Sequence, residues 1–427
     1  MLGRFWFATA LVLFVGWTAG ASEPIETPLQ RIDERAPVSI PEATPLAVRF
    51  HETGHWVWAF AKAWNLAVPA LILLSGLSVR MRDFARKVAR GRLIPTVALY
   101  LSLFLTLSFL ADLPLSYFVG FVRQHAYGLS NQTFAKWLGN SFKGHLVDVL
   151  GASAFAWVPF WLIGRFPKHW WLILSGLSIP FTAFVVLITP VWIDPLFNEF
   201  GPMKNKALEA KILALAERAG IEGGQVFEVN KSVDTKAVNA YVTGLLGTHR
   251  IVLWDTLLAR LDDRGVLAVM GHEMGHFALR HVERGVLLSS VLVLAGLFWT
   301  DRAGRRLIAR FGSKMGVDSL ADIAATPLLL ILLSLGTTAL YPIGLAFSRY
   351  QEHEADRFSL ELTRTNHSAA LAFADLQREN LGIPQPDPFC MIFRYTHPSV
   401  ADRITFCNTY RPWDETKPLR YSDRFKP

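Results

Sequence analysis

The sequence predicts a mostly α-helical membrane protein that carries an α+β domain outside the membrane. Three observations support this fold class. The 427 residues are 52% hydrophobic with a mean hydropathy of +0.29, a composition typical of membrane proteins. Six apolar segments recur along the chain, each bounded by polar or charged residues. Two polar stretches, one between these segments and one after them, are long enough to fold.

The N-terminus has the pattern of a secretory signal peptide. Arg4 precedes an apolar run over residues 5–17, and Ala19-Gly20-Ala21 follows as a small-residue cleavage site. We therefore expect residues 1–21 to be a signal peptide, with an uncleaved first membrane anchor as the alternative. The Pro- and Glu-rich composition that follows predicts an exposed linker over residues 22–55.

The apolar segments predict six membrane-spanning helices, because a span needs about 20 apolar residues. The first four make up an N-terminal membrane region over residues 56–192, and the last two interrupt a domain over residues 193–427. The fifth segment is short, so we expect the helix before it to run directly into it. The segments lie at about 56–78, 94–121, 146–164, 169–192, 285–300 and 325–347.

Basic residues concentrate in three of the loops between these segments. Residues 80–92 hold six basic side chains and one acidic one, residues 302–314 hold five basic ones, and the short loop 165–168 is also basic. With six spans, all three loops lie on one side of the membrane, which the positive-inside rule places in the cytoplasm. We therefore expect a multi-pass protein of a bacterial inner membrane whose domain faces the periplasm. The isoelectric point of about 9.5 has this topological origin, and no nucleic-acid partner is expected.

The first polar stretch has the pattern of an α+β fold. A helix is expected over Lys204–Ala219 and strands over Gln225–Val229, Ala237–Val242 and Arg250–Trp254. The middle strand contains Asn239, Ala240 and Tyr241 and resembles an edge strand, to which an extended peptide substrate binds by adding a strand. An internal strand is the alternative.

The most informative motif is His272-Glu273-Met274-Gly275-His276, an H-E-x-x-H on an expected helix. Residues four apart lie on one helix face, so His272 and His276 can bind one metal ion. A catalytic zinc site has three protein ligands and an open position for water, and Glu352 is the candidate for the third ligand. The sequence therefore predicts one Zn²⁺ per chain and a peptide-bond hydrolase.

Four further residues have expected roles in this chemistry. Glu273 is the candidate general base toward the zinc-bound water. Asp356, one turn after Glu352, is placed to accept a hydrogen bond from a ligand histidine. His397 and Arg403 are candidate donors to the oxyanion, although a late histidine is more often structural. A zinc-binding membrane scaffold or a transporter without peptidase turnover are the alternative functions.

A second H-E-x-x-H, His51-Glu52-Thr53-Gly54-His55, lies just before the first apolar segment. No E-x-x-x-D follows it nearby, and its Pro, Thr and Gly context is poor for a helix interior. It is interpreted as a coincidence, with a secondary, adventitious metal site as the alternative. The two cysteines, Cys390 and Cys407, are expected to be unpaired thiols, with one disulfide as the alternative.

Several strings along the chain resemble the type I CAAX prenyl proteases, a family of integral-membrane zinc metallopeptidases. The resemblance spans most of the chain from Trp56 onward. It implies a ring of membrane helices around a water-filled chamber, with a gluzincin-like zinc site as its roof. It also implies the same zinc ligands, Glu273 as base, Asp356 beside the ligands, Asn239 on the substrate strand, and His397 and Arg403 near the reaction centre. The strings are Leu110–Tyr117, Val238–Leu245, Arg250–Leu257, Gly271–His276, Ser348–Asp356 and Thr396–Ser399.

This chain also departs from that family. Val238 stands where the family has serine, and the expected six spans and periplasmic face differ from the seven spans and cytosolic site of eukaryotic members. Prenylated CAAX proteins are not expected as substrates in a bacterial periplasm. We therefore expect the partners to be membrane lipid and a polypeptide substrate that is misfolded, membrane-associated or lipidated.

Overall fold

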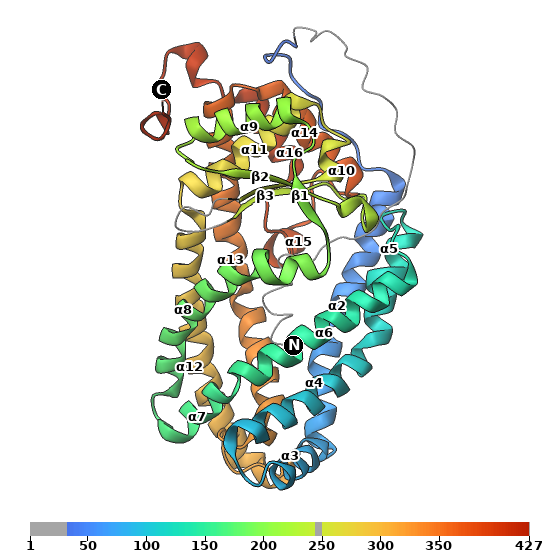
Figure 1. The fold of residues 1–427 in the computed structure, drawn as a ribbon, viewed down its shortest axis with the longest axis vertical. Coiled ribbons are helices and arrows are strands. Elements are labelled where there is room, and N and C mark those ends of the chain that lie inside the picture. The colour runs from blue at the N-terminus through green and yellow to red at the C-terminus, as the bar shows by residue number, and fades with distance from the viewer. Residues whose placement is uncertain (1–31, 244–249, 427) are drawn as a thin grey trace.

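The computed structural model describes residues 32–243 and 250–426. Figure 1 shows long helices in its lower part and a small sheet with its covering helices in its upper part. The predicted signal peptide or anchor at residues 1–21 lies outside the described residues.

Six long apolar helices confirm the predicted spans within the described residues. Four of these spans include further short helical segments that adjoin the main α-helix in the chain. The helices are α2 (Pro45–Leu74), α4 (Leu93–Tyr117, continued through Phe118–Val122 into α5, Arg123–Ala126), α6 (Phe134–Phe155) with α7 (Trp157–Arg165), α8 (Trp170–Ile188), α12 (His281–Met315) and α13 (Thr326–Thr363).

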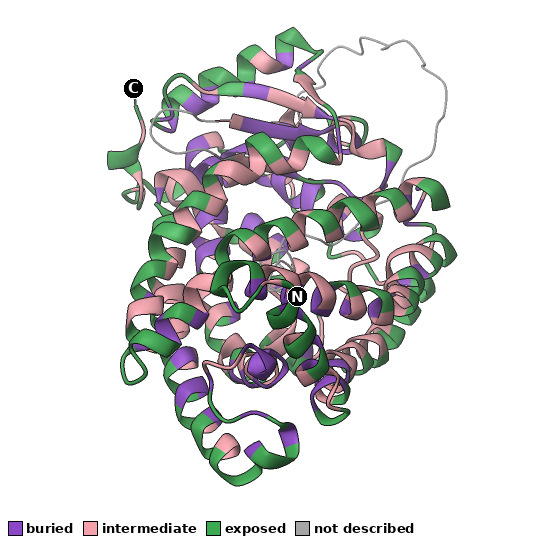
Figure 2. Cartoon of the chain, turned by 60° about the horizontal axis from the view of Figure 1, so that its bottom comes forward, coloured by how far each residue is buried: buried purple, intermediate pink, exposed green. Residues whose placement is uncertain are grey.

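The outer surfaces of these helices are exposed and apolar. Figure 2 shows exposed residues along the outsides of the helices and buried ones toward the interior. Only 6% of the most apolar window of α12 and 11% of that of α8 is buried within the protein. Leu71 of α2 and Leu287 of α12 are 66% and 69% exposed. Apolar surface on this scale is stable only against lipid, so these faces contact the hydrocarbon of a membrane.

The predicted exposed linker is shorter and more packed than its composition suggested. Helix α2 begins at Pro45 because the Thr44 side chain caps it, accepting from the amide of Ala47 at 3.1 Å. Residues 45–55 are therefore helical, and the expectation that the 51–55 segment avoids a helix is wrong. Upstream, Val38 is 9% exposed and its backbone is paired with the side chain of Asn408.

The three basic segments lie together at one end of the molecule, although residues 302–314, expected to be a loop, form the last turns of α12. The first contains a short helix, α3 (Leu77–Val88), next to the α12–α13 connection at the bottom of Figure 1. Arg82 forms an ion pair with Asp322 and donates to the Gly316 carbonyl at 3.3 Å. Arg305 donates to the carbonyl of Pro167 in the third loop. The sheet lies at the opposite end in the same view.

The sheet has four strands in the order β1-β2-β4-β3: β1 (Phe200–Pro202), β2 (Gln225–Val229), β3 (Ala240–Thr243) and β4 (Arg250–Trp254). β2 and β4 are parallel, and β1 and β3 are antiparallel to their neighbours. The predicted strands are confirmed, with β3 starting three residues later than expected. Helices α9 (Lys206–Arg218), α10 (Asp255–Leu258) and α11 (Asp263–Ala278) belong to this region.

One apolar core joins the sheet to the helices around it. Ile212 of α9, Ile251 of β4, Met270 and Met274 of α11 and Phe358 of α13 are fully buried in it. Because α13 is also a membrane helix, this core fixes the α+β region on the membrane region. The remaining helices are α14 (Asn366–Glu379), α15 (Pro388–Phe393) and α16 (Val400–Thr409).

The expected continuation of the motif helix into the fifth span is wrong. Helix α11 ends at Ala278, and Arg280 has a left-handed backbone with φ 54°. A left-handed residue ends the run of helical hydrogen bonds, so α12 starts at His281 in a new direction. His281 is thereby placed beside the site rather than farther along the same helix.

Candidate metal centre

The H-E-x-x-H motif lies on the second half of α11. The Asp262 side chain caps this helix by accepting from the amide of Gly265 at 2.8 Å, and apolar residues then bury one face. His272 and His276 are four residues apart, and their Nε2 atoms are 3.1 Å apart. His272 is buried and His276 is partly buried.

Glu352 of α13 meets both imidazoles, as predicted. Its Oε2 lies 3.1 Å from His272 Nε2, and its Oε1 lies 3.4 Å from His276 Nε2. The three residues form one of two groups in the described residues that offer three or more ligand atoms within 4.8 Å. Segments about eighty positions apart in the sequence thus supply one donor set.

Two glycines allow α11 and α13 to approach closely enough for this. A Cβ added at Gly275 would lie 3.2 Å from the Ala355 backbone, and one added at Gly271 would lie 2.8 Å from Ser359 Oγ. Both glycines are buried and alternate with the ligand histidines along α11. The distance between the ligand histidines and Glu352 therefore depends on the absence of these side chains.

We expect Gly275→Val to weaken metal binding. Overpacking at a tight contact costs about 1–3 kcal/mol, and here it separates α11 from α13. Metal affinity is expected to fall by about ten- to a hundredfold, measured by competition with a chelator. Gly285→Val on α12 is the matched control, because a Cβ there has no atom within 4 Å. Equal affinity in the two variants would contradict this role.

Asp356 and Arg403 form a buried network behind His272. Asp356 Oδ1 lies 2.7 Å from His272 Nδ1. Arg403 of α16 donates through Nε to Asp356 Oδ2 at 2.9 Å and through Nη2 to Oδ1 at 2.6 Å. When Nδ1–H donates to Asp356, the Nε2 lone pair of His272 faces Glu352, the orientation a metal ligand needs. Asp356 therefore lies where the sequence expects it, within hydrogen-bonding distance of His272, and Arg403 contacts Asp356.

His397 also reaches the ligand group. Its Nε2 lies 3.2 Å from Glu352 Oε2, and its side chain is 52% exposed. Desolvation by the surrounding protein lowers the pKa of His397 and so favours the neutral imidazole, while the carboxylate of Glu352 opposes this change. A neutral imidazole keeps one N–H to donate.

Glu273 follows His272 on α11 and is partly buried. Burial raises the pKa of its carboxyl group, while the neighbouring histidines oppose this change. A carboxylate with a raised pKa is a better proton acceptor near neutral pH.

His281 contacts His276, which the spacing of the two residues in the sequence did not predict. A continuous helix would turn it about 140° away from His276. Because the chain breaks at Arg280, its Nδ1 lies 3.0 Å from His276 Nδ1. His281 is therefore a hydrogen-bond partner of a ligand histidine and not a fourth member of the donor set. The left-handed conformation of Arg280 explains this contact, and it is visible only in the structure.

The candidate substrate strand lies at an edge of the sheet. β3 pairs with β4 on one side, and no described residue pairs with its other side. Asn239, immediately before β3, is exposed, Ala240 is buried and Tyr241 is partly buried. Of the two alternatives for this segment, the edge strand is the one observed.

The donor set fits a zinc ion. Ligand atoms about 2.0–2.2 Å from a tetrahedral metal are separated by about 3.3–3.6 Å. The histidine nitrogens lie 3.1 Å apart, and each lies 3.1 or 3.4 Å from a different oxygen of Glu352. Glu352 Oε2 is buried, and the imidazole nitrogens of His272 and His397 beside it do not have hydrogen-bonding geometry. A buried carboxylate oxygen facing two imidazole nitrogens is satisfied by a cation between them.

Comparison with known proteins identifies the family. Residues 202–410 match peptidase family M48, and residues 51–199 match the CAAX prenyl protease N-terminal family, described by five membrane helices. The uncharacterized metalloprotease YhfN of Bacillus subtilis (strain 168) is 40% identical over 334 residues, which cover 78% of each chain. The chain belongs to peptidase family M48. Within its described residues, the N-terminal match contains four candidate spans rather than five.

Two further relatives place this M48 peptidase among the CAAX prenyl proteases, as the resemblance in the sequence predicts. CAAX prenyl protease 1 of Saccharomyces cerevisiae is 28% identical over 365 residues, covering 81% of this chain and 77% of the relative. The crystal structure of S. mikatae Ste24p matches with a TM-score of 0.74 and 25% identity, covering 84% of this chain and 87% of that one. The fold class is confirmed, and the protein is a multi-pass membrane metalloprotease.

Proposed function

We propose that this M48 metalloprotease is a zinc endopeptidase in which His272, His276 and Glu352 hold the catalytic ion. The observation that supports this most directly is the convergence of the three residues, each of which offers a ligand atom within 4.8 Å of the other two. When bound, zinc supplies Lewis acidity toward the scissile carbonyl and acidifies a water molecule.

Glu273 is the proposed general base. It would take a proton from the attacking water and return it to the leaving amine. Its position directly after His272 directs it to the same region of α11 as the ligands, and its raised pKa suits proton transfer near neutral pH.

Three other residues have proposed supporting roles. His397 would donate its N–H to the oxyanion, because it is the accessible imidazole next to Glu352. Asp356 would hold His272 in the ligating tautomer. Arg403 is a positioning residue, since two of its contacts fix Asp356 and a third reaches His272 Nδ1 at 3.3 Å.

The substrate would bind as an added strand on β3. An extended peptide beside Asn239, Ala240 and Tyr241 gains main-chain hydrogen bonds that do not depend on its sequence. Such binding suits an endopeptidase that acts on many polypeptides. An edge strand with one free side is the structural requirement for this mode.

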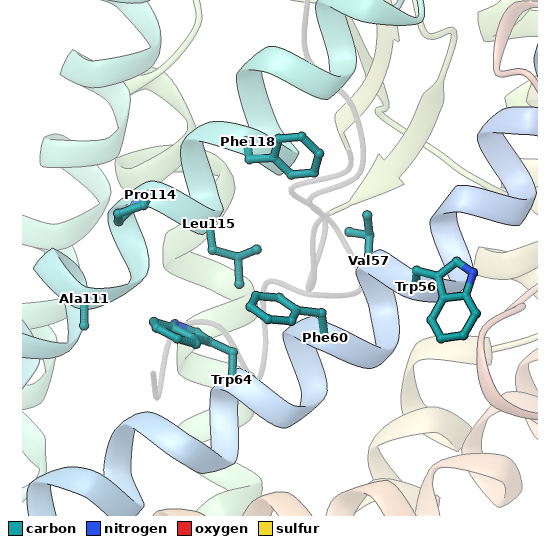
Figure 3. Close-up of a pocket in the computed structure, with 8 residues that line it drawn as sticks. All are labelled: Trp56, Val57, Phe60, Trp64, Ala111, Pro114, Leu115 and Phe118. Atoms are coloured by element: carbon teal, nitrogen blue, oxygen red, sulfur yellow. The ribbon is translucent and has the colours of Figure 1, made fainter.

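A membrane-associated or lipidated polypeptide is the proposed substrate class. An apolar pocket of about 470 Å³ lies between α2 and α4. Figure 3 shows the aromatic and aliphatic side chains that line it. Such a lining is suited to an alkyl chain or an apolar segment. The clustering of the basic loops supports the proposed orientation, with the zinc site on the periplasmic side of a bacterial inner membrane.

Metal removal tests the proposed function. We expect a chelator to abolish cleavage of a quenched casein substrate, and stoichiometric Zn²⁺ to restore it, because the site depends on its ion. A prenylated peptide assayed in parallel shows whether lipid attached to the substrate increases kcat/KM. Cleavage that survives complete loss of metal would exclude the proposed mechanism.

A further inference from the structure

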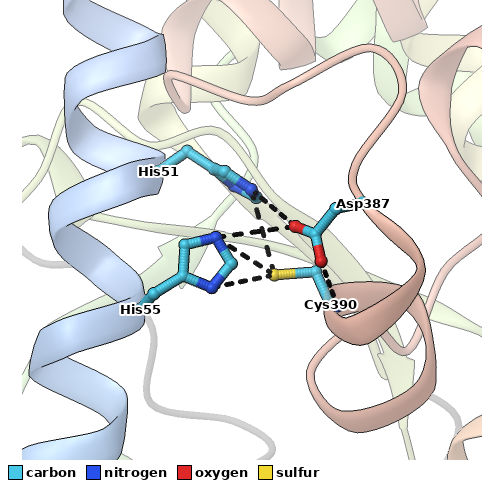
Figure 4. Close-up of side chains that lie close together, drawn as sticks. All are labelled: His51, His55, Asp387 and Cys390. Carbon is cyan, nitrogen blue, oxygen red and sulfur yellow. Dashed lines mark hydrogen bonds and ion pairs between the residues drawn. The ribbon is translucent and has the colours of Figure 1, made fainter.

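The two histidines of the second H-E-x-x-H motif lie close to other potential metal ligands in the structure. His51 and His55 of α2 face Asp387 and Cys390 at the start of α15 (Figure 4). The four residues are the other group in the described chain that offers ligand atoms within 4.8 Å of one another. This arrangement favours the alternative for the 51–55 motif, a secondary metal site, over coincidence.

Local structure places each of these side chains. His51 and His55 are one turn apart on α2, so both rings point to one side. Asp387 caps α15 by accepting from the amide of Cys390 at 3.0 Å, which brings the carboxylate and the thiol together. Gly54 leaves room for Arg394 beside α2, because a Cβ at this position would lie 3.3 Å from the guanidinium of Arg394.

The distances match the edges of a coordination tetrahedron. Asp387 Oδ2 lies 3.2 Å from His51 Nε2 and 3.5 Å from His55 Nε2. For a tetrahedral zinc with nitrogen and oxygen ligands, about 3.3–3.4 Å is expected. Cys390 Sγ lies 3.9 Å from His51 Nε2 and 4.0 Å from His55 Nε2, the same two nitrogens, where about 3.6 Å is expected with a Zn–S bond of about 2.3 Å. Shifts of a few tenths of an ångström complete the geometry.

The chemistry of the donors favours a borderline-soft divalent cation. Two imidazoles, one carboxylate and one thiolate form a closed set of four that leaves no position for water. Glu52, the residue that corresponds in this motif to a catalytic base, is exposed and is not among the four. Arg394 Nη1 lies 3.3 Å from Cys390 Sγ and is placed to donate to the metal-bound sulfur.

We propose that His51, His55, Asp387 and Cys390 form a second, structural metal site that binds Zn²⁺. The site joins the first described membrane helix to α15, which precedes His397 in the chain. Arg349 of α13 holds the same segment through the carbonyls of Met391 and Tyr395, the latter at 2.8 Å. The second ion would therefore fix the approach of the chain to His397 without taking part in hydrolysis.

The test uses the whole purified protein and the metal alone. Zinc analysis is expected to give two ions per chain, and X-ray absorption is expected to show a Zn–S distance of about 2.3 Å, because the catalytic site contains no sulfur. In the Co²⁺-substituted protein, the thiolate is expected to give a near-ultraviolet sulfur-to-metal charge-transfer band. The wild-type measurements need no variant to fold.

Paired variants show which residues bind each ion and which one gives the charge-transfer band. Cys390→Ser is expected to remove the charge-transfer band and one ion, whereas Cys407→Ser is expected to keep both, because Cys407 is buried away from any such group. His276→Ala is expected to lose the other ion and keep the band, which separates this proposal from that of the catalytic site. One ion per chain with no sulfur ligand would overturn the proposal and leave a hydrogen-bonded cluster at this position.

Discussion

Glu273→Ala is expected to lower kcat by about 10²–10⁴-fold while leaving the metal content at its wild-type value. The carboxylate is the proposed proton acceptor and is not in the donor set of His272, His276 and Glu352. Its loss should therefore remove proton transfer and leave the ion in place. Single-turnover cleavage of a quenched casein substrate, with zinc measured in the same preparation, gives both values.

Glu52→Ala is the matched control for this experiment. Glu52 occupies the same position in the second H-E-x-x-H, is exposed and has no role in the proposed hydrolysis. We expect it to leave kcat unchanged. If the Glu273 variant cleaved at the wild-type rate with full metal content, another group would have to be the base.

Arg403→Ala is expected to destabilise the protein by about 3–5 kcal/mol. Its side chain is 11% exposed and that of Asp356 is 1% exposed, so the substitution leaves a buried carboxylate without its guanidinium partner. The melting temperature in detergent should fall accordingly. Metal affinity should also fall, by about 10–100-fold, because Asp356 orients His272.

An exposed ion pair is the control for Arg403→Ala, because removing it shows the effect of losing an ion pair at the surface. Arg378 bonds Asp375 at 2.8 Å, with side chains 61% and 39% exposed. Arg378→Ala should change stability by about 0–1 kcal/mol and leave metal affinity unchanged. Similar losses in the two variants would mean that Arg403 has no special role behind His272.

The sequence was most informative where chemistry dictates spacing. The i, i+4 separation of His272 and His276 and the position of Asp356 one turn after Glu352 follow from helix geometry alone. For the same reason, alternation and turn residues located the strands β2 and β4. These features depend only on residues that are close together in the sequence.

Contacts that depend on tertiary packing were not predictable. His281 reaches His276 only because Arg280 breaks the helix, and no local pattern marks that break. Likewise, nothing in the spacing of Asp387 and Cys390 points to His51, more than three hundred residues earlier. The buried position of Val38 depends on its pairing with Asn408, which composition does not reveal.

The continuous helix α13 joins an apolar span directly to a residue of the candidate metal centre. It runs for 38 residues, about 57 Å at 1.5 Å per residue, and carries both an apolar span and Glu352. Glu352 lies about 39 Å along the axis from Thr326, compared with a hydrocarbon thickness of about 30 Å. Because the span continues into Glu352 within one helix, a substrate of the proposed membrane-anchored class would reach the candidate metal centre at a set distance from its anchor.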